Sequence, residues 1–194
     1  MKDRLRRTRL YMPGNNPNLL QNIAVFSADT VILDLEDAVA LSEKDAARIL
    51  VKYTLQNVDF GNSEKGIRIN PLDTQYGKED AEMAVQSGAE IIFLPKTENA
   101  KSVLELEDII KKKEIWISPI IETAKGVLNA NEIAASSPKV VMICFGAEDF
   151  TKDIGAERTK EGKELFWARS MIVMAAKANG IQASDTVFSD INDI

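Results

Sequence analysis

Hydrophobic residues in this sequence gather in short, almost uninterrupted runs that alternate with segments of helical periodicity. A run without regular polar interruption is typical of a strand that is buried on both of its faces, as strands of parallel sheets are. In chain order, the predicted strands are Arg9–Met12, Thr30–Leu35, Gly66–Ile69, Ile91–Leu94, Ile115–Ile121, Lys139–Phe145 and Ile181–Ser184.

The segments between these runs carry apolar residues at helical spacing. Ser42, followed by Asp45 three residues later, is predicted to cap a helix, and Gly88 and Gly180 are predicted to end two others. The predicted helices are Asn18–Ser27, Ser42 to about Tyr53, Lys78–Gln86, Ala100–Lys112, Lys125–Ala135 and Lys163–Asn179, with a loop from Phe145 to Gly162. In the last helix, four large side chains are predicted to lie in the core: Phe166, Trp167, Met171 and Met174.

The regular alternation of strands and helices predicts an α/β fold with a parallel sheet and right-handed crossovers. A Rossmann sheet would carry GxGxxG after a strand, and the sequence has no such motif. Repeated strand–helix units favour a (β/α)8 TIM barrel, which typically needs about 250 residues. We therefore expect one barrel domain over residues 1–194 that lacks the eighth strand and the final helices, and so a C-terminally incomplete chain.

Composition narrows the class of protein further. The 194 residues carry a net charge of −6, which argues against nucleic acid as a partner, and 45% are hydrophobic, as expected of a globular domain. No apolar run reaches the length of about 18 residues that a membrane span needs, so we expect no membrane association and a cytoplasmic location. The single cysteine, Cys144, is predicted to be a buried thiol. A basic cluster near the start is read as a solvated tail or as a patch for an acidic carrier protein: Lys2, Arg4, Arg6, Arg7 and Arg9.

Charged side chains follow most of the predicted strands. The most informative run, Val140–Phe150, stops at Gly146 and then delivers Glu148 and Asp149. The carboxyl ends of barrel strands converge on one mouth, where such folds place their chemistry. The side chains expected to meet there are Asp34, Glu36, Asp37, Arg68, Asn70, Lys96, Glu122, Glu148, Asp149 and Asp185.

Carboxylates must perform any metal-binding or acid–base role here, because the sequence has no histidine. Several acids without a thiolate or imidazole cluster suit a hard cation such as Mg²⁺. Glu122 and Asp149 are the best candidate ligands, since each follows an apolar strand. The alternative is that these two acids cap the helices that follow them. Position along the sequence leaves both interpretations open.

Two basic residues of this set have competing interpretations as well. Arg68 could bind a substrate carboxylate, or it could form an internal salt bridge with Asp34 or Glu36. Lys96 could form a Schiff base or be a solvated loop residue. The loop Met12–Asn16 could bind a phosphate or a pantetheine arm through its amides, or it could be only a turn.

Ordered motifs along essentially the whole chain resemble the citrate lyase β-subunits of the HpcH/HpaI aldolase family, which also contains malyl-CoA and citramalyl-CoA lyases. The motifs are RTRLYMPGNNP, VILDLEDAVALSEKDAAR, RIN, IFLPKTE, PIIETAKGV, FGAEDFTKDIGAERT, ELFWARS and GIQASDTVFSD. The resemblance implies a (β/α)8 barrel, Glu122 and Asp149 as Mg²⁺ ligands, and Arg68 as the arginine that binds a substrate carboxylate, with Glu122 also beside the substrate.

The activity implied by the resemblance is a Mg²⁺-dependent carbon–carbon lyase that cleaves citryl-ACP, a thioester on an acyl carrier protein, to oxaloacetate and acetyl-ACP. It further implies other citrate lyase subunits as partners and a homo-oligomer. The general base is left open between Asp37, a metal-bound water and an acid of a C-terminal segment that this sequence lacks. The alternatives are a malyl-CoA or citramalyl-CoA lyase and a truncated, non-catalytic assembly subunit.

Overall fold

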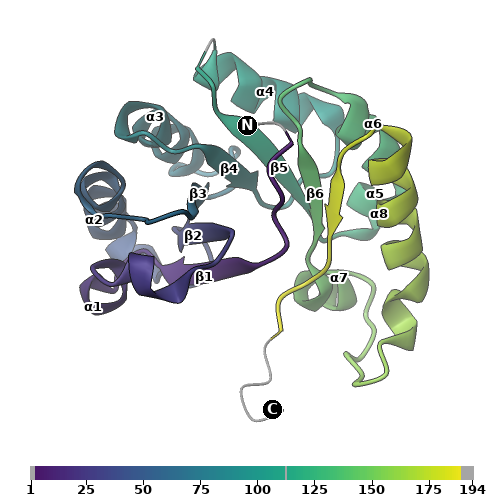
Figure 1. Ribbon diagram of the computed structural model, residues 1–194. Coiled ribbons are helices and arrows are strands. Elements are labelled where there is room, and N and C mark those ends of the chain that lie inside the picture. Colours follow the sequence, from purple (N-terminus) through teal and green to yellow (C-terminus); the bar gives the residue numbers. More distant parts are fainter. Residues whose placement is uncertain (1–2, 112, 189–194) are drawn as a thin grey trace.

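A curled sheet of seven parallel strands forms the centre of the computed structural model, which describes residues 3–111 and 113–188 (Figure 1). Each strand pairs with the strands that precede and follow it in the sequence, as the alternation of strands and helices predicted. The strands are β1 (Arg9–Pro13), β2 (Thr30–Asp34), β3 (Glu64–Arg68), β4 (Ile91–Leu94), β5 (Trp116–Ile121), β6 (Met142–Phe145) and β7 (Gln182–Ser184).

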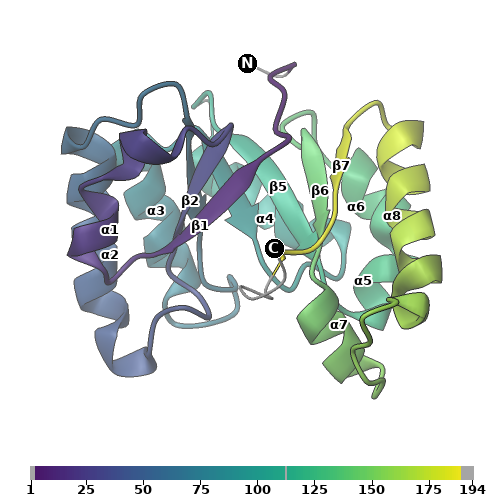
Figure 2. The same ribbon diagram turned by 60° about the horizontal axis from the view of Figure 1, so that its bottom comes forward.

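Helices cover the outer, convex face of the sheet (Figure 2). They are α1 (Pro17–Leu20), α2 (Lys44–Asn57), α3 (Gly77–Ser87), α4 (Ala100–Ile110), α5 (Ala124–Leu128), α6 (Ala130–Ala135), α7 (Ala147–Asp153) and α8 (Phe166–Ala178). Within the described part of the chain, none of them is long and apolar enough to cross a membrane.

The sheet is a curled half-barrel and not a complete eight-stranded barrel. Its outermost strands are β1 and β7, and these do not pair with each other in the described residues. Side chains join the two edges instead: the Gln182 amide donates to the Arg4 carbonyl oxygen at 2.7 Å, and its Oε1 accepts from the Arg6 backbone N–H at 3.2 Å. The side-chain amide of Gln182 thus donates one hydrogen bond and accepts another, as the peptide group of a neighbouring strand would.

Apolar residues fill both sides of the sheet. Between the sheet and the helices, alternate residues such as Val31, Leu33 and Ile67 are fully buried. On the concave side, Ile32 and Phe93 belong to a second buried cluster. Burial on both faces explains why the strands read as uninterrupted apolar runs. It also confirms the prediction that Cys144, on the concave side, is a buried thiol.

Several helix predictions were wrong in detail. The predicted helix Asn18–Ser27 is a short helix, α1, followed by a separate 3₁₀ turn, Ile23–Phe26. The predicted helix Lys125–Ala135 is divided at Asn129, whose side chain donates to the Glu98 carbonyl oxygen at 2.8 Å. Ser42 lies in a 3₁₀ turn before α2 and does not cap that helix, while α7 occupies part of the predicted loop. Lys112, the predicted end of α4, lies outside the described residues.

Three of the four large residues predicted to lie in the core from α8 were misplaced, whereas Met171 is partly buried and packs against the core. Phe166, Trp167 and Met174 are mostly exposed, because the buried face of this helix is formed by smaller residues at helical spacing. Those residues are Ala168, Ile172, Ala175 and Ala176. A helix with two apolar faces gives no sequence signal for which of them is turned inward.

The basic cluster near the N-terminus is built into the structure. The Arg6 guanidinium is buried and donates to both carboxylate oxygens of Glu64, at 2.7 and 2.6 Å. Arg7 pairs with Asp29 in the same way, at 3.1 and 2.9 Å. The interpretation as a solvated tail is therefore wrong for Arg6, whereas the side chain of Arg7 is paired but 71% exposed to solvent. Lys2 lies outside the described residues.

Candidate active site

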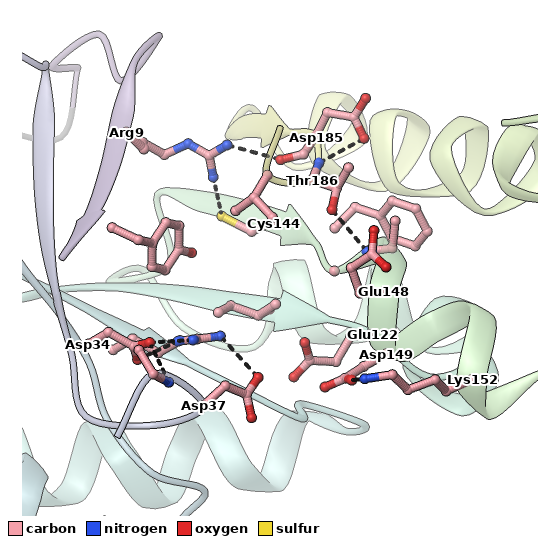
Figure 3. A pocket seen from close by; sticks show the side chains of 18 of the residues that line it. Arg9, Asp34, Asp37, Glu122, Cys144, Glu148, Asp149, Lys152, Asp185 and Thr186 are labelled. Atoms are coloured by element: carbon pink, nitrogen blue, oxygen red, sulfur yellow. Dashed lines mark hydrogen bonds and ion pairs between the residues drawn. The ribbon is translucent and has the colours of Figure 1, made fainter. Parts of the chain in front are cut away.

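A cavity of about 510 Å³ opens on the concave side of the sheet at the carboxyl ends of its strands (Figure 3). Residues that are distant in the sequence meet here, as the alignment of strand ends predicted. Its charged lining residues are Arg9, Asp34, Asp37, Arg68, Glu122, Glu148, Asp149, Lys152 and Asp185. A second cavity adjoins it and shares Glu122, Asp149 and Lys152 with it.

Glu122 directly follows β5 and is buried, with 5% of its surface exposed. Its Oε1 accepts a hydrogen bond of 2.6 Å from the backbone N–H of Lys96. Burial, reinforced by the charges of Glu36 and Asp149, raises the pKa of Glu122 to about 7. The cap of the following helix is Thr123, whose hydroxyl accepts from the Gly126 N–H at 3.1 Å. The alternative that Glu122 caps α5 is therefore wrong.

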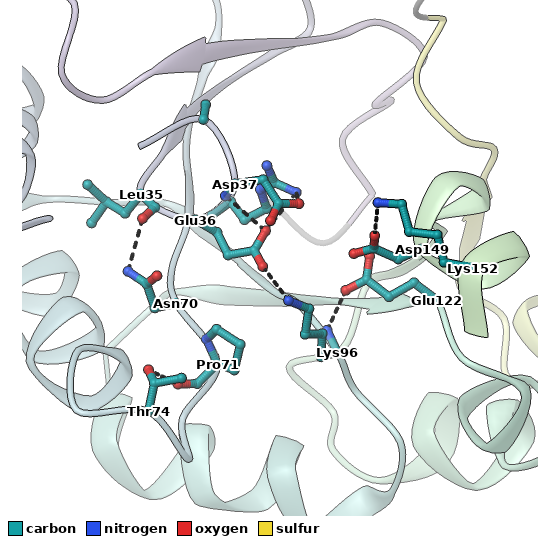
Figure 4. Close-up of polar contacts among 12 residues, drawn as sticks. Leu35, Glu36, Asp37, Asn70, Pro71, Thr74, Lys96, Glu122, Asp149 and Lys152 are labelled. Atoms are coloured by element: carbon teal, nitrogen blue, oxygen red, sulfur yellow. Dashed lines mark hydrogen bonds and ion pairs between the residues drawn. The ribbon is translucent and has the colours of Figure 1, made fainter. Parts of the chain in front are cut away.

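Asp149 lies in the first turn of α7, the helix that follows β6. Its Oδ1 accepts from the Lys152 ammonium at 2.9 Å. Gly146 holds the N-cap position of α7, and no side chain caps this helix, so the capping interpretation is wrong for Asp149 as well. Figures 3 and 4 both show the carboxyl groups of Glu122 and Asp149 side by side, each at the end of a neighbouring strand.

Glycine at position 146 leaves room for the Glu122 side chain. A Cβ at that position would lie 2.6 Å from Oε2 of Glu122 and 2.8 Å from its Cβ. Separations that short do not occur between non-bonded atoms, so a larger residue would displace the carboxylate. The glycine that follows β6 thus shapes the position of an acid at the end of the neighbouring strand, β5.

The donor set fits a magnesium ion. Glu122 and Asp149 offer oxygen ligands from two adjacent strands, and Mg²⁺ typically takes only one or two carboxylates and fills its other positions with water and substrate. Within the described ranges, no group of three or more acidic, cysteine or histidine side chains is arranged to enclose a metal. The pair therefore suits a cation that must remain open to a substrate more than a closed structural site.

Arg68, at the end of β3, is held by acids of the β2 end. It donates to Asp34 through Nε at 2.7 Å and through its terminal nitrogen at 2.5 Å, and its other terminal nitrogen lies 3.2 Å from Oε2 of Glu36. The salt-bridge interpretation of Arg68 is thus confirmed. These contacts outweigh the effect of burial, so the pKa of Arg68 is raised and the side chain stays charged. Because Arg68 also lines the cavity, binding of a substrate carboxylate stays a prediction.

Lys96 links the two groups of acids (Figure 4). Its ammonium lies 3.0 Å from Oε1 of Glu36, while its amide donates to Glu122. Burial lowers the pKa of Lys96, but the hydrogen bond and charge of Glu36 outweigh burial, and the pKa is raised overall. A Schiff base requires a neutral amine, so this environment argues against that role. Lys96 also has a φ of 50°, which is uncommon for a residue with a side chain.

The remaining candidates divide between the cavity and the scaffold. Asp37 is 60% exposed at the mouth, and its Oδ2 lies 3.6 Å from an Arg68 nitrogen. Glu148 and Asp185 line the cavity and pair with Arg158 and Arg169. Asn70 is a scaffold residue: it is buried, does not line the cavity, and donates to Asp80 at 2.7 Å and to the Leu35 carbonyl oxygen at 3.0 Å.

The loop Met12–Asn16 forms a turn into α1. Asn16 caps that helix, and the Gly14 N–H donates to the Asp34 carbonyl oxygen at 2.8 Å. A Cβ on Gly14 would lie 2.7 Å from that oxygen, so glycine is needed for the close approach. These contacts are those of a turn, so the turn interpretation of this loop is confirmed. A role in binding phosphate or pantetheine stays a prediction.

Sequence reasoning missed three contributors to the site. The Lys96 amide carries no sequence signal, since its direction depends on the backbone. Gly146 was visible as the end of a strand, but not as the space for Glu122. Arg9 was assigned to the basic cluster, although its place as the first residue of an inward-alternating strand could have indicated the cavity.

A parallel half-barrel whose strand ends bring acids and an arginine into one cavity is typical of α/β enzymes, which place their sites at the carboxyl ends of parallel strands. The HpcH/HpaI aldolase/citrate lyase family model matches residues 7–194, and the chain belongs to this family.

Curated relatives and solved structures agree with this assignment. The chain is 46% identical to citrate lyase subunit beta of Leuconostoc mesenteroides subsp. cremoris, over 98% of this chain and 66% of that protein, and 34% identical to the mitochondrial citramalyl-CoA lyase of Homo sapiens, over 97% and 61%. It thus spans about two thirds of the length of such relatives. The Mycobacterium tuberculosis citrate lyase beta subunit complexed with oxaloacetate and magnesium superimposes with a TM-score of 0.80 at 33% identity, over 97% of this chain and 82% of that chain.

Proposed function

We propose that this chain forms the catalytic half-barrel of a Mg²⁺-dependent carbon–carbon lyase that cleaves a citryl thioester on an acyl carrier protein. The observation that carries the proposal is the pair of carboxylates Glu122 and Asp149, at the ends of adjacent strands and in one cavity with Arg68. Relatives named citrate lyase subunit beta, at 40–46% identity, and the related structure with oxaloacetate and magnesium support it.

The reaction is a retro-Claisen cleavage. The tertiary hydroxyl of the citryl group loses its proton, and the bond from the carbinol carbon to the CH₂ beside the thioester breaks. The electron pair of that bond forms the thioester enolate, which takes up a proton to give the acetyl thioester, while the carbinol carbon becomes the ketone of oxaloacetate. When bound by Glu122 and Asp149, Mg²⁺ would supply Lewis acidity to the hydroxyl and carboxylate oxygens of the substrate.

Arg68 is the residue that we propose to orient a substrate carboxylate and to offset charge as it develops. Its two hydrogen bonds to Asp34 and its contact with Glu36 fix the guanidinium plane before the substrate arrives. A guanidinium fixed in this way needs little reorganisation to accept an anion on its cavity side. Glu122 lies beside the same bound acyl group in this arrangement.

Asp37 is our candidate for the general base. It is an exposed carboxylate at the mouth that lies next to Arg68, and it can exchange protons with solvent. The alternatives are a metal-bound water and an acid supplied from outside this sequence. Replacing Asp37 by Asn should lower kcat far more than the affinity for the substrate if Asp37 is the base.

The partners follow from the same proposal. An acyl carrier protein would deliver the substrate on its pantetheine arm, and other citrate lyase subunits and further copies of this chain would complete the assembly, in the cytoplasm. A second candidate function is a malyl-CoA or citramalyl-CoA lyase, which is favoured by the relatives that carry such names and by the related CitE structure with magnesium, acetoacetate and coenzyme A. A non-catalytic assembly role is the remaining alternative.

An assay of citryl, malyl and citramalyl thioesters, each with Mg²⁺ and with EDTA, tests the proposal. We expect cleavage of the citryl thioester on the carrier that EDTA abolishes and that Asp149→Asn reduces at least hundredfold. Glu148→Gln is the matched control, because Glu148 is the adjacent acid and is paired with Arg158. Activity that survives EDTA would contradict the metal assignment, and preference for a CoA thioester would favour the second candidate.

A further inference from the structure

A second guanidinium, that of Arg9 on β1, reaches into the cavity from the wall opposite Asp34 and Asp37 (Figure 3). One of its terminal nitrogens donates to Sγ of Cys144 at 3.1 Å, and the other donates to the backbone carbonyl oxygen of Asp185 at 2.9 Å. Both acceptors are uncharged groups. Within the described residues, Arg9 forms no ion pair.

The other cations at this mouth have carboxylate partners. Arg68 is paired with Asp34 and Glu36, and Lys152 is paired with Asp149. In the adjoining cavity, Lys96 is paired with Glu36. Arg9 is therefore the cation of the cavity lining whose charge the described protein does not offset. A planar guanidinium with nitrogens on two edges is well suited to receive a carboxylate.

The substrates of the candidate functions differ in one carboxylate. The carbinol carbon of a citryl thioester bears a carboxylate and a CH₂–carboxylate arm, a citramalyl thioester has a methyl group in place of that arm, and a malyl thioester has a hydrogen. Because the cavity is lined by more acidic than basic side chains, each carboxylate of the acyl group needs its own cation to be bound favourably.

We propose that Arg9 binds the CH₂–carboxylate arm of the citryl group and selects the citryl thioester over citramalyl and malyl thioesters. This inference rests on the proposed function and adds a substrate-binding residue to it. Arg68 and the metal site hold the carboxylate and hydroxyl of the carbinol carbon, and Arg9 holds the arm that points to the wall formed by β1, β6 and the end of β7. The same contact retains oxaloacetate, which keeps this arm.

Equilibrium binding of two small 2-oxo acids tests the inference. Oxaloacetate carries the arm and pyruvate has a methyl group in its place, so their affinity ratio measures recognition of the arm alone. We expect wild type, titrated with Mg²⁺ and freshly dissolved oxaloacetate, to bind oxaloacetate at least tenfold more tightly than pyruvate. Arg9→Gln should weaken oxaloacetate binding by about tenfold to hundredfold and change pyruvate binding less than twofold.

Two further variants separate recognition from structure. Arg9→Lys keeps the charge and should retain part of the preference, so it stands in for Arg9→Gln if the latter unfolds. Cys144→Ser removes the thiol that Arg9 contacts and should leave the preference unchanged. If an Arg9 variant weakens both acids equally, or neither, the inference is overturned while the proposed function stands. If wild type binds neither acid with Mg²⁺, the proposed function itself fails, and this inference fails with it.

Discussion

The backbone amide of Lys96 and the carboxylate of Glu122 are joined by a hydrogen bond of 2.6 Å between the ends of β4 and β5. Lys96 takes a φ of 50° in the structure, a conformation that a residue with a side chain adopts only at some cost. The amide fixes one oxygen of Glu122 and leaves the other for a ligand. Backbone geometry at one strand end therefore orients an acid on the next.

Metal-free protein should lose stability as the pH rises from about 4.5 to about 7. The pKa of Glu122 is about 7 in the folded state against an ordinary value of 4.5, so the folded state binds the proton more tightly. The protonated carboxyl makes its full contribution to the free energy of unfolding below about pH 4.5. This contribution is lost as the pH approaches 7, and the free energy of unfolding falls by up to about 3 kcal/mol. Urea unfolding in EDTA at pH 5, 6, 7 and 8 measures this. Glu122→Gln should flatten the profile, and parallel profiles for the two proteins would contradict the assignment.

Magnesium affinity should rise with pH as well. The proton and the cation compete for the Glu122 carboxylate, so the dissociation constant for Mg²⁺ should fall about tenfold between pH 6 and pH 8. Calorimetric titration at both pH values checks this, and proton release measured in two buffers of different ionisation enthalpy provides an independent readout. An affinity that does not depend on pH would mean that Glu122 is not a ligand.

Gly146→Ala should weaken Mg²⁺ binding by at least tenfold. The added Cβ would lie 2.6 Å from Oε2 of Glu122 and would displace the carboxylate. The matched control is Gly126→Ala, whose Cβ would lie 2.7 Å from the Thr97 carbonyl oxygen, away from the Glu122 carboxylate. Both variants should lower the melting temperature, but only Gly146→Ala should lower the Mg²⁺ affinity.

Arg68→Ala should cost about 3 to 5 kcal/mol of stability in addition to activity, because it leaves the buried carboxylate of Asp34 without its cation and leaves Glu36 with Lys96 alone. A double variant, Arg68→Ala with Asp34→Asn, should recover part of that stability without recovering activity. Unfolding in urea and a lyase assay of both variants separate the structural role of Arg68 from its proposed role in binding substrate. Recovery of activity in the double variant would contradict the second role.

The sheet could be predicted from the sequence because burial on both faces leaves a strong signal in each strand. The runs around Ile32, Phe93 and Ile143 are apolar for this reason, and all seven predicted strands are present. Helix ends were less predictable, because they depend on tertiary contacts such as that of the Asn129 side chain with Glu98. The exposure of Trp167 depends on which of two apolar faces packs against the sheet.

For the candidate site, the sequence could predict only which residues lie at the same end of the sheet. Parallel strands place Glu122 and Asp149 at the same end of the sheet, and this follows from the order of strands alone. The direction of a side chain does not follow from it. Arg9 stands at the start of its strand but reaches the Asp185 carbonyl oxygen, just beyond β7, because its long side chain crosses the concave face. The stagger of the strands decides which groups the Arg9 side chain can reach, and the sequence does not reveal that stagger.

The contact of Gln182 with the backbone of Arg4 and Arg6 bears on how the chain folds during synthesis. It joins residues that are 178 positions apart, so nearly the whole chain described here must leave the ribosome before the contact can form. Local strand–helix units can assemble earlier, but the entropy of such a long loop makes this closure late and slow. Until then, the two edges of the sheet are not held together by these hydrogen bonds.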